Sequence, residues 1–368
     1  MTCCTADPGG RRRFLAAALG AVAAACAGPT TAGSAKRERE ITRQGIAALG
    51  PIVDPHAHPG RFTLAVTGEL SLAAIEEMRS ANVHCAFFAA VGDGLVIRRE
   101  GGTGPIRNYR DPVADELYRS TIGQLERVRR RGQEGHVRLV RGRADLVRLT
   151  DIPTPSALLA IEGGDPLEGK VERVREFYEL GVRSIQLVHY RVNELGDIQT
   201  EDSVHNGLTP FGADAVRTCN RLGIIVDVAH ATWEATRQAA KISTRPLLLS
   251  HTFLRDAPRR YTRGITREHA LTVKETGGVI GVVPFPSVFF TLQDYTEGIA
   301  RMADAVGVNH VGIGGDLAGV RGGPPYHRFE QFPALVQMLQ NRGFGSDDVA
   351  RIAGGNFMRL FLAVSDLA

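Results

Sequence analysis

The sequence predicts an α/β fold, a TIM-like (β/α)8 barrel formed by one domain. Three observations carry this prediction: eight short apolar runs rich in β-branched residues, helical patterns between most of them, and a length of 368 residues, which barrels of this class commonly reach as a single domain. Strands that alternate with helices favour a parallel sheet, and eight of them favour closure. The predicted strands are Ile52–His58, His84–Val91, Ala157–Glu162, Ser184–His189, Ile224–His230, Pro246–His251, Gly278–Phe285 and His310–Asp316.

Apolar residues at helical spacing lie between most of these runs. The predicted helices are Leu72–Ser80, Val113–Arg131, Val171–Leu180, Phe211–Leu222, Thr232–Lys241, Arg267–Glu275 and Asp294–Val306. An open, doubly wound sheet is the alternative, and its signature is a glycine-rich phosphate turn after an early strand. The first predicted strand ends instead in His56-Ala57-His58, so the barrel is preferred. Two long loops, Gly92–Asp111 and Gly319–Phe329, are candidates for lids or specificity walls.

The first 27 residues predict an export signal. Three arginines precede a short apolar stretch with small residues, and Arg11-Arg12-Arg13-Phe14-Leu15 resembles a twin-arginine signal. The apolar stretch is too short to span a bilayer comfortably. Simple cleavage is preferred, and a lipid anchor at Cys26 is the alternative. We expect an exported, periplasmic or cell-envelope protein with a flexible linker over residues 28–45 and a catalytic domain over residues 46–368.

Composition narrows the class of partner. Hydrophobic residues make up 43% of the chain and charged residues 23%, which allows a large core and excludes wholesale disorder. The formal net charge is only +4, and no Lys/Arg cluster with interleaved aromatic residues is present, so nucleic acid is not expected as a partner. Outside the leader, Cys85 and Cys219 are expected to pack in the core rather than form a disulfide framework. A small-molecule substrate is expected, and a homodimer remains open.

Side chains that can bind metal ions gather at the ends of the predicted strands. Because the carboxyl ends of barrel strands converge on one mouth, these side chains are expected to lie close together. They are His56, His58, Glu162, His189, His230, His251 and Asp316. The pattern indicates a metal centre.

Each of these residues suggests a role by its position. His56 and His58 are two apart on a strand, so both side chains face the same way and can hold one ion. A buried carboxylate at Glu162 requires a cation, and its two oxygens can bridge two ions. His230 and His251 end neighbouring apolar strands and are credible ligands of a second ion, although each alone would more often be a core histidine.

Two further residues are candidates for catalysis. His189 could polarise a substrate carbonyl, with metal-ligand and structural roles as alternatives. Asp316 is the natural group to take a proton from metal-bound water and pass it to a leaving amine. Asp54 could support a neighbouring imidazole or substitute as a ligand. No nucleophile elbow and no phosphate-binding loop compete with metal chemistry.

These residues and their surroundings resemble the membrane (renal-type) dipeptidase family of the metal-dependent amidohydrolase barrels. The matching segments follow the family's order over about residues 50–360, which makes the resemblance specific. They are Asp54-Pro-His-Ala-His58, Ala160-Ile-Glu-Gly-Gly164, Leu187-Val-His189 through Asn193-Glu-Leu-Gly196, Gly207-Leu-Thr-Pro-Phe-Gly212, Ile225-Val-Asp-Val-Ala-His230, Ser250-His251, Gly277-Gly-Val-Ile-Gly281, Val311-Gly-Ile-Gly-Gly-Asp316 and Gly354-Gly-Asn-Phe357.

The resemblance implies a site with two divalent ions, usually zinc, that hydrolyses the peptide bond of dipeptides by attack of a metal-bridging hydroxide. Glu162 would bridge the ions, with the first-strand pair on one and His230 and His251 on the other. His189 would contact the substrate's carbonyl and Asp316 would handle protons. An arginine of the family clamps the substrate's terminal carboxylate. The Arg259-Arg260 pair, in a loop with four arginines (Arg255–Arg263), matches it, and Arg260 is favoured.

Two positions depart from the family pattern. The first strand carries His58 where the family typically has an aspartate, which makes the site one charge unit more positive and leads us to expect a more acidic bridging water. Asp165 stands where the family has a histidine after the two glycines. Two alternatives to a dipeptidase therefore remain: another amidohydrolase that acts on a different amide, a lactam or a lactone, and a non-catalytic exported binding or maturation protein.

Overall fold

The computed structural model describes residues 45, 48–61, 70–102, 104–255 and 262–365. These residues belong to one compact unit, Thr42–Ala368. The predicted leader, the candidate lipid site Cys26 and the candidate clamp Arg260 lie outside the described residues, as does the predicted linker except for residue 45. None of the described helices is both long and apolar enough to cross a membrane.

Eight parallel strands form a barrel in the order β1-β2-β6-β7-β8-β9-β11-β12. The barrel closes between β1 and the segment after β12, where Asp316 donates its backbone N–H to the His56 carbonyl (2.8 Å) and His58 donates to the Leu317 carbonyl (2.8 Å). The predicted fold class is therefore confirmed. The strands are β1 Val53–Ala57, β2 Cys85–Val91, β6 Ser156–Glu162, β7 Val182–Gln186, β8 Ile225–Asp227, β9 Leu248–Leu254, β11 Val279–Val282 and β12 Val311–Ile313.

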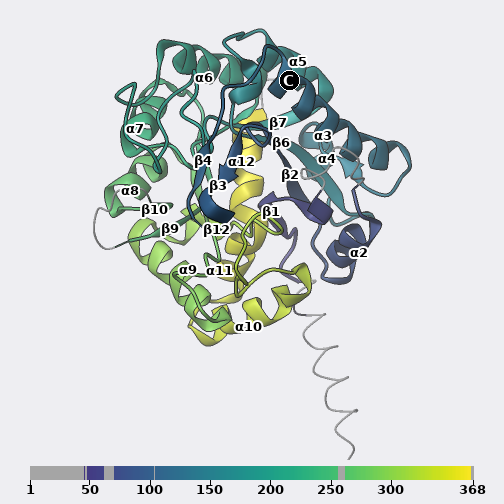
Figure 1. Cartoon of the computed structure of the whole chain (residues 1–368). Coiled ribbons are helices and arrows are strands. Elements are labelled where there is room, and N and C mark those ends of the chain that lie inside the picture. The colour runs from purple at the N-terminus through teal and green to yellow at the C-terminus, as the bar shows by residue number, and fades with distance from the viewer. Residues whose placement is uncertain (1–44, 46–47, 62–69, 103, 256–261, 366–368) are drawn as a thin grey trace, which may run out of the picture. The chain divides into compact units, whose positions relative to one another are not determined.

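Helices surround the barrel (Figure 1). All seven predicted helices are present, with ends that differ by at most three residues from the prediction. Four consecutive helices, α6 to α9, begin after a threonine whose side chain accepts a backbone N–H of the first turn, which satisfies a donor that the helix itself cannot. The helices are α2 Leu72–Ser80, α3 Glu116–Gln133, α4 Arg143–Leu146, α5 Arg173–Leu180, α6 Pro210–Leu222, α7 Trp233–Ile242, α8 Arg267–Glu275, α9 Leu292–Val306, α10 Phe332–Asn341, α11 Ser346–Ala350 and α12 Asn356–Ser365.

The core has two parts because the side chains of each strand alternate between two faces. Along β2, Ala86 and Phe88 face the larger cluster that the outer helices cover, whereas Cys85 and Phe87 belong to a second cluster with α12. Helix α12 lies at the centre of the ring in Figure 1 and contributes Phe361 to this second cluster. Apolar side chains thus fill the barrel next to α12, and the candidate site residues belong to neither apolar cluster.

Cys85 and Cys219 are buried and free, as predicted for core cysteines. Burial raises the pKa of each thiol to about 12, so neither is a reactive thiolate at neutral pH.

Five of the eight barrel strands, β1, β7, β8, β11 and β12, end earlier than the sequence predicts. Only Glu162 is the last residue of its strand; His189, His230 and Asp316 each lie three residues beyond β7, β8 and β12. His251 lies inside β9. Most of the candidate side chains therefore project from the first residues after the strands rather than from the strands themselves.

Four short strands lie off the barrel path and were not predicted. β5 (Arg138–Leu139) pairs with β6, and β10 (Gly264–Ile265) pairs with β9. β3 (Ile97–Arg99) and β4 (Ile106–Asn108) form an antiparallel hairpin within the long loop after β2. An ion pair between Arg107 and Glu201 (2.5 Å) ties this hairpin to the segment after β7.

Candidate metal centre

The Glu162 carboxylate lies among five imidazoles. Glu162 is 3% exposed and ends β6. The distances from its Oε1 are 3.3 Å to His56 Nε2, 3.2 Å to His189 Nε2, 3.6 Å to His230 Nε2 and 3.6 Å to His251 Nε2, and Oε2 lies 3.4 Å from His58 Nε2. Side chains from four other barrel strands, or from the residues directly after them, therefore meet at the Glu162 carboxylate.

The first-strand histidines form one half of the cluster. His58 Nε2 lies 3.4 Å from Asp316 Oδ1, and His56 Nε2 lies 3.9 Å from the same oxygen. His58 Nδ1 donates to the Ala89 carbonyl (2.8 Å), which fixes that proton on Nδ1 and leaves Nε2 as a lone pair toward Glu162. His56, His58 and Glu162 can thus offer three ligand atoms to one ion.

The other half is formed by His230 and His251. Their Nε2 atoms are 3.0 Å apart, and both lie 3.6 Å from Glu162 Oε1. The Ser250 hydroxyl lies 2.9 Å from His251 Nδ1. His230 has a φ of 66°, which is a left-handed backbone conformation. This conformation costs a non-glycine residue about 1–3 kcal/mol and is found most often at functional sites. Asp316 shares this property with a φ of 43°.

His189 lies as close to Glu162 as the predicted ligands do. Together with Glu162 and His230 it forms a second group that could hold an ion. Its Nδ1 lies 2.7 Å from Asp93 Oδ1. Burial alone would lower the pKa of His189, but the Asp93 and Glu162 carboxylates raise it to about 9. A role in substrate contact and a role as a metal ligand are both compatible with this position.

The charge of the cluster suits cation binding. Burial would raise the pKa of Glu162, but His189, His56 and His58 hold it well below the usual value, so the carboxylate is ionised. Burial lowers the pKa of His230 and of His251 well below the usual value, and nearby positive groups, including Arg263, lower both further. Both rings are therefore neutral at pH 7, the form in which imidazole binds metals.

Two buried atoms of the cluster indicate whether a metal ion would fit between these residues. Among the described residues, His56 Nε2 and Asp316 Oδ1 are buried and have no hydrogen-bond partner. A buried polar atom without a partner is costly unless a cation or another ligand satisfies it. The donors are imidazole nitrogens and carboxylate oxygens, the ligand types that zinc prefers besides thiolate. The residues present therefore fit divalent metal ions.

Asp54 supports the strand rather than an imidazole ring. Its Oδ1 accepts the backbone N–H groups of His56 (3.1 Å) and Gly315 (3.1 Å), which joins β1 to the segment after β12. Burial raises the pKa of Asp54 to about 7. Both of these contacts are to backbone groups, so they support neither of the two suggested roles of Asp54, as a partner of an imidazole ring or as a substitute ligand.

Arg263 is a candidate for the arginine that clamps the substrate's terminal carboxylate, and the sequence did not single it out. It is 7% exposed, donates from Nη2 to the His251 carbonyl (3.1 Å) and donates from Nη1 to Gln199 Oε1 (2.7 Å). The sequence favoured Arg260 instead, which lies outside the described residues. The signal that distinguishes Arg263 is its place directly before β10, whose pairing with β9 brings this arginine beside the cluster.

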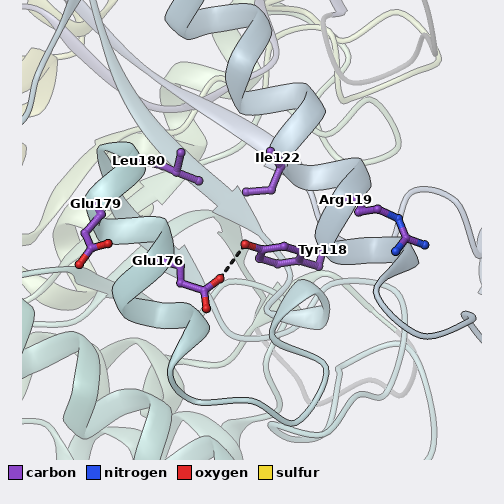
Figure 2. A pocket seen from close by; sticks show the side chains of 6 residues that line it. All are labelled: Tyr118, Arg119, Ile122, Glu176, Glu179 and Leu180. Carbon is purple, nitrogen blue, oxygen red and sulfur yellow. Dashed lines mark hydrogen bonds between the residues drawn. The ribbon is translucent and has the colours of Figure 1, made fainter.

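A surface groove elsewhere lacks this chemistry. It lies between α3 and α5, has a volume of about 490 Å³ and is lined by Tyr118, Arg119, Ile122, Glu176, Glu179 and Leu180 (Figure 2). The Tyr118 hydroxyl donates to Glu176 across it (2.6 Å). The lining contains no imidazole, so the cluster around Glu162 is the better candidate.

Loss of the Glu162 charge should empty the centre. We expect wild-type protein reconstituted with zinc to retain two ions per chain and Glu162→Gln to retain fewer than one, because a neutral amide cannot balance two cations. Elemental analysis after gel filtration measures this. Glu176→Gln, which removes a carboxylate from the groove between α3 and α5, should retain two ions. A Glu162→Gln protein that also keeps two ions would contradict the assignment.

Several curated proteins with sequences similar to this chain are named dipeptidases. A dipeptidase of Schizosaccharomyces pombe that is itself uncharacterised is 34% identical over 221 residues, which cover 58% of this chain and 54% of the relative. A dipeptidase of Claviceps purpurea is 26% identical over 276 residues, 71% of this chain and 64% of the relative. The chain spans about half the length of the curated relatives it matches.

Solved structures confirm the fold. A probable dipeptidase of Pseudomonas aeruginosa superposes with a TM-score of 0.74 at 18% identity, covering 90% of this chain and 100% of that chain. A metallo peptidase of Rhodobacter sphaeroides, solved with a phosphinate mimic of the dipeptide L-Ala-D-Ala, gives a TM-score of 0.71 at 20% identity, with coverage of 85% and 99%.

The family assignment rests on a sequence profile that covers most of the chain. The profile of the membrane dipeptidase family, peptidase family M19, matches residues 73–368. This region contains every residue of the cluster described above except His56 and His58, which the barrel closure brings to the same mouth. The chain therefore belongs to the membrane dipeptidase family, peptidase family M19.

Proposed function

We propose that this protein is a metal-dependent dipeptidase with two divalent ions, zinc in the first instance. The observation that carries the proposal is the position of Glu162, whose carboxylate lies within 3.6 Å of ring nitrogens from both halves of the cluster. A single carboxylate between two pairs of imidazoles is the arrangement that a bridged pair of cations requires.

The ligands divide between the two ions. His56 and His58 would hold one ion and His230 and His251 the other, and Glu162 would be a ligand of both. When bound, such a pair of ions activates water and polarises the scissile carbonyl, which is the chemistry of hydrolysis at neutral pH. The side chains around the pair then perform orientation and proton transfer.

Two residues act on the substrate beside the ions. His189 contacts the carbonyl of the scissile bond, since its Nε2 lies 3.2 Å from Glu162 Oε1 and thus among the predicted ligands. Asp316 takes a proton from the attacking water and passes it to the leaving amine. Its Oδ1 has no hydrogen-bond partner among the described residues and lies 3.4 Å from His58 Nε2, so it is available at the cluster.

The names of related structures support dipeptides as the substrate class. The metallo peptidase of Rhodobacter sphaeroides was solved with a mimic of L-Ala-D-Ala. An amidohydrolase of Pseudomonas aeruginosa has a similar fold, with a TM-score of 0.70 at 20% identity. Amides other than dipeptides are therefore alternative substrates.

A substrate panel tests the proposed function. We expect zinc-reconstituted protein to hydrolyse L,L- or L,D-dipeptides, including L-Ala-D-Ala, and to lose activity when a chelator removes the metal. Release of free amino acids is the measurement. Hydrolysis of N-acyl amino acids, lactams or lactones without dipeptides would establish another amidohydrolase, and absence of turnover in fully metallated protein would point to a binding protein.

Replacing the arginine that binds the substrate's terminal carboxylate should raise KM. A charge-assisted hydrogen bond contributes about 1.5–3 kcal/mol, so replacing the correct arginine by lysine should raise KM for dipeptides about tenfold or more, with a smaller effect on kcat. We expect this for Arg263→Lys, because Arg263 is buried beside His251. Arg260→Lys is the matched control, and the opposite ranking of the two variants would restore Arg260 as the clamp.

We also propose export, on the basis of the leader at residues 1–27. N-terminal sequencing of protein from the periplasm measures this. A mature chain that begins after Ala27 supports simple cleavage, a chain that begins with a modified Cys26 supports the lipid anchor, and a cytoplasmic chain that retains the leader contradicts export.

A further inference from the structure

Asp93 is a fully buried carboxylate that no sequence pattern singles out. It lies two residues beyond β2, within Gly92-Asp93-Gly94, and is 0% exposed. Both of its oxygens are used: Oδ1 lies 2.7 Å from His189 Nδ1, and Oδ2 accepts the backbone N–H of Tyr190 at 2.9 Å. The carboxylate therefore contacts the ring of His189 and the backbone that follows it.

Close approach of three strand ends fixes this arrangement. Gly92 donates its backbone N–H to the Glu162 carbonyl (2.8 Å), and a Cβ on Gly92 would lie 2.1 Å from the Gly163 carbonyl oxygen. A Cβ on Gly163 would in turn lie 2.9 Å from His189 Cβ, and the φ of Gly163 is 87°. Two glycines thus allow the ends of β2, β6 and β7 to pack together, which holds Asp93 against His189.

The contact with Asp93 determines which ring atom of His189 reaches the site. A carboxylate accepts hydrogen bonds, so His189 Nδ1 carries the proton that Asp93 binds. Nε2, on the other side of the ring, then faces Glu162 Oε1 at 3.2 Å. If the Asp93 bond were absent, the ring could rotate about its side-chain torsions and Nε2 would no longer be held in this direction.

We propose that Asp93 is a positioning residue, which holds the imidazole of His189 by Nδ1–H so that Nε2 points at the carbonyl of the substrate. This inference rests on the proposed function, because it assigns His189 to substrate contact. The hydrogen bonds of its carboxylate go to His189 and to the backbone of Tyr190, so Asp93 acts through His189.

The kcat values of single and double variants measure the coupling between Asp93 and His189. We expect Asp93→Ala to lower kcat for a dipeptide about 10–100-fold, with KM changed much less, as is typical when a carboxylate behind a functional histidine is removed. In a His189→Gln background the same change should add almost nothing, because its partner is already absent. Asp93→Asn should recover part of the loss, since the amide oxygen can still accept from Nδ1–H.

Asp197 provides a matched control. It is equally buried in a loop at the same end of the barrel, and it accepts the backbone N–H groups of Val204, His205 and Gly207 without any contact to His189. Asp197→Asn therefore tests the general effect of losing a buried carboxylate. Its effect on kcat should be the same in the wild-type and His189→Gln backgrounds.

A second readout does not depend on activity. In metal-free protein with ¹⁵N-labelled histidine, we expect a slowly exchanging Nδ1–H signal from His189, which is assigned by its disappearance in His189→Gln. This signal should be lost in Asp93→Ala and persist in Asp197→Asn. Elemental analysis should find two ions in Asp93→Ala and in His189→Gln. Thermal unfolding establishes that each variant is folded, and Asp93→Asn replaces Asp93→Ala if the latter is not.

Three results would overturn the inference. One is a loss of kcat in Asp93→Ala that is undiminished by His189→Gln, and another is the absence of the Nδ1–H signal from wild type. The third is a loss of metal in both variants, which would make His189 a ligand. If wild type hydrolyses no dipeptide, the proposed function fails by itself, while the histidine signal still decides whether Asp93 holds the ring.

Discussion

A buried glutamate surrounded by imidazoles is the constraint on which the rest of the site depends. An isolated carboxylate at 3% exposure would be expensive. Five ring nitrogens lie within 3.6 Å of the Glu162 oxygens, and three of those rings, His189, His56 and His58, lower the pKa of Glu162 so that it remains ionised. Some of those rings are themselves neutral, so the cluster as a whole still offers lone pairs and negative charge to cations. The stability of the mouth and its chemistry are therefore set by the same contacts.

The barrel makes this meeting possible by geometry alone. Parallel strands deliver their carboxyl ends to one rim, and closure between β1 and the segment after β12 brings His56 and Asp316 together although they are 260 residues apart in the chain. Glycines at the rim allow backbones to approach more closely than side chains would permit. Strain is accepted at His230 and Asp316, whose left-handed backbone turns each side chain inward just after its strand has ended.

Much of this could be predicted from the sequence, and the omissions have physical causes. The eight strands are recognisable as apolar runs. The metal-ligand candidates are recognisable because each is a polar interruption of such a run; they are His56, His58, Glu162, His230 and His251. Arg263 was missed because it is brought inward by β10, a strand of two residues that has no pattern of its own. Asp93 sits in a Gly-Asp-Gly turn, where an aspartate ordinarily serves the turn itself, and only the fold reveals His189 beside it. The hairpin of β3 and β4 is too short and too rich in arginine to show alternation.

The central claim is that Glu162 binds two cations at once. Anomalous diffraction at the zinc edge from crystals of the reconstituted protein measures it most directly. We expect two peaks about 3.5–4 Å apart, one on each side of the Glu162 carboxylate, with His56 and His58 at one and His230 and His251 at the other. A single peak, or a pair of peaks that Glu162 does not join, would contradict the account.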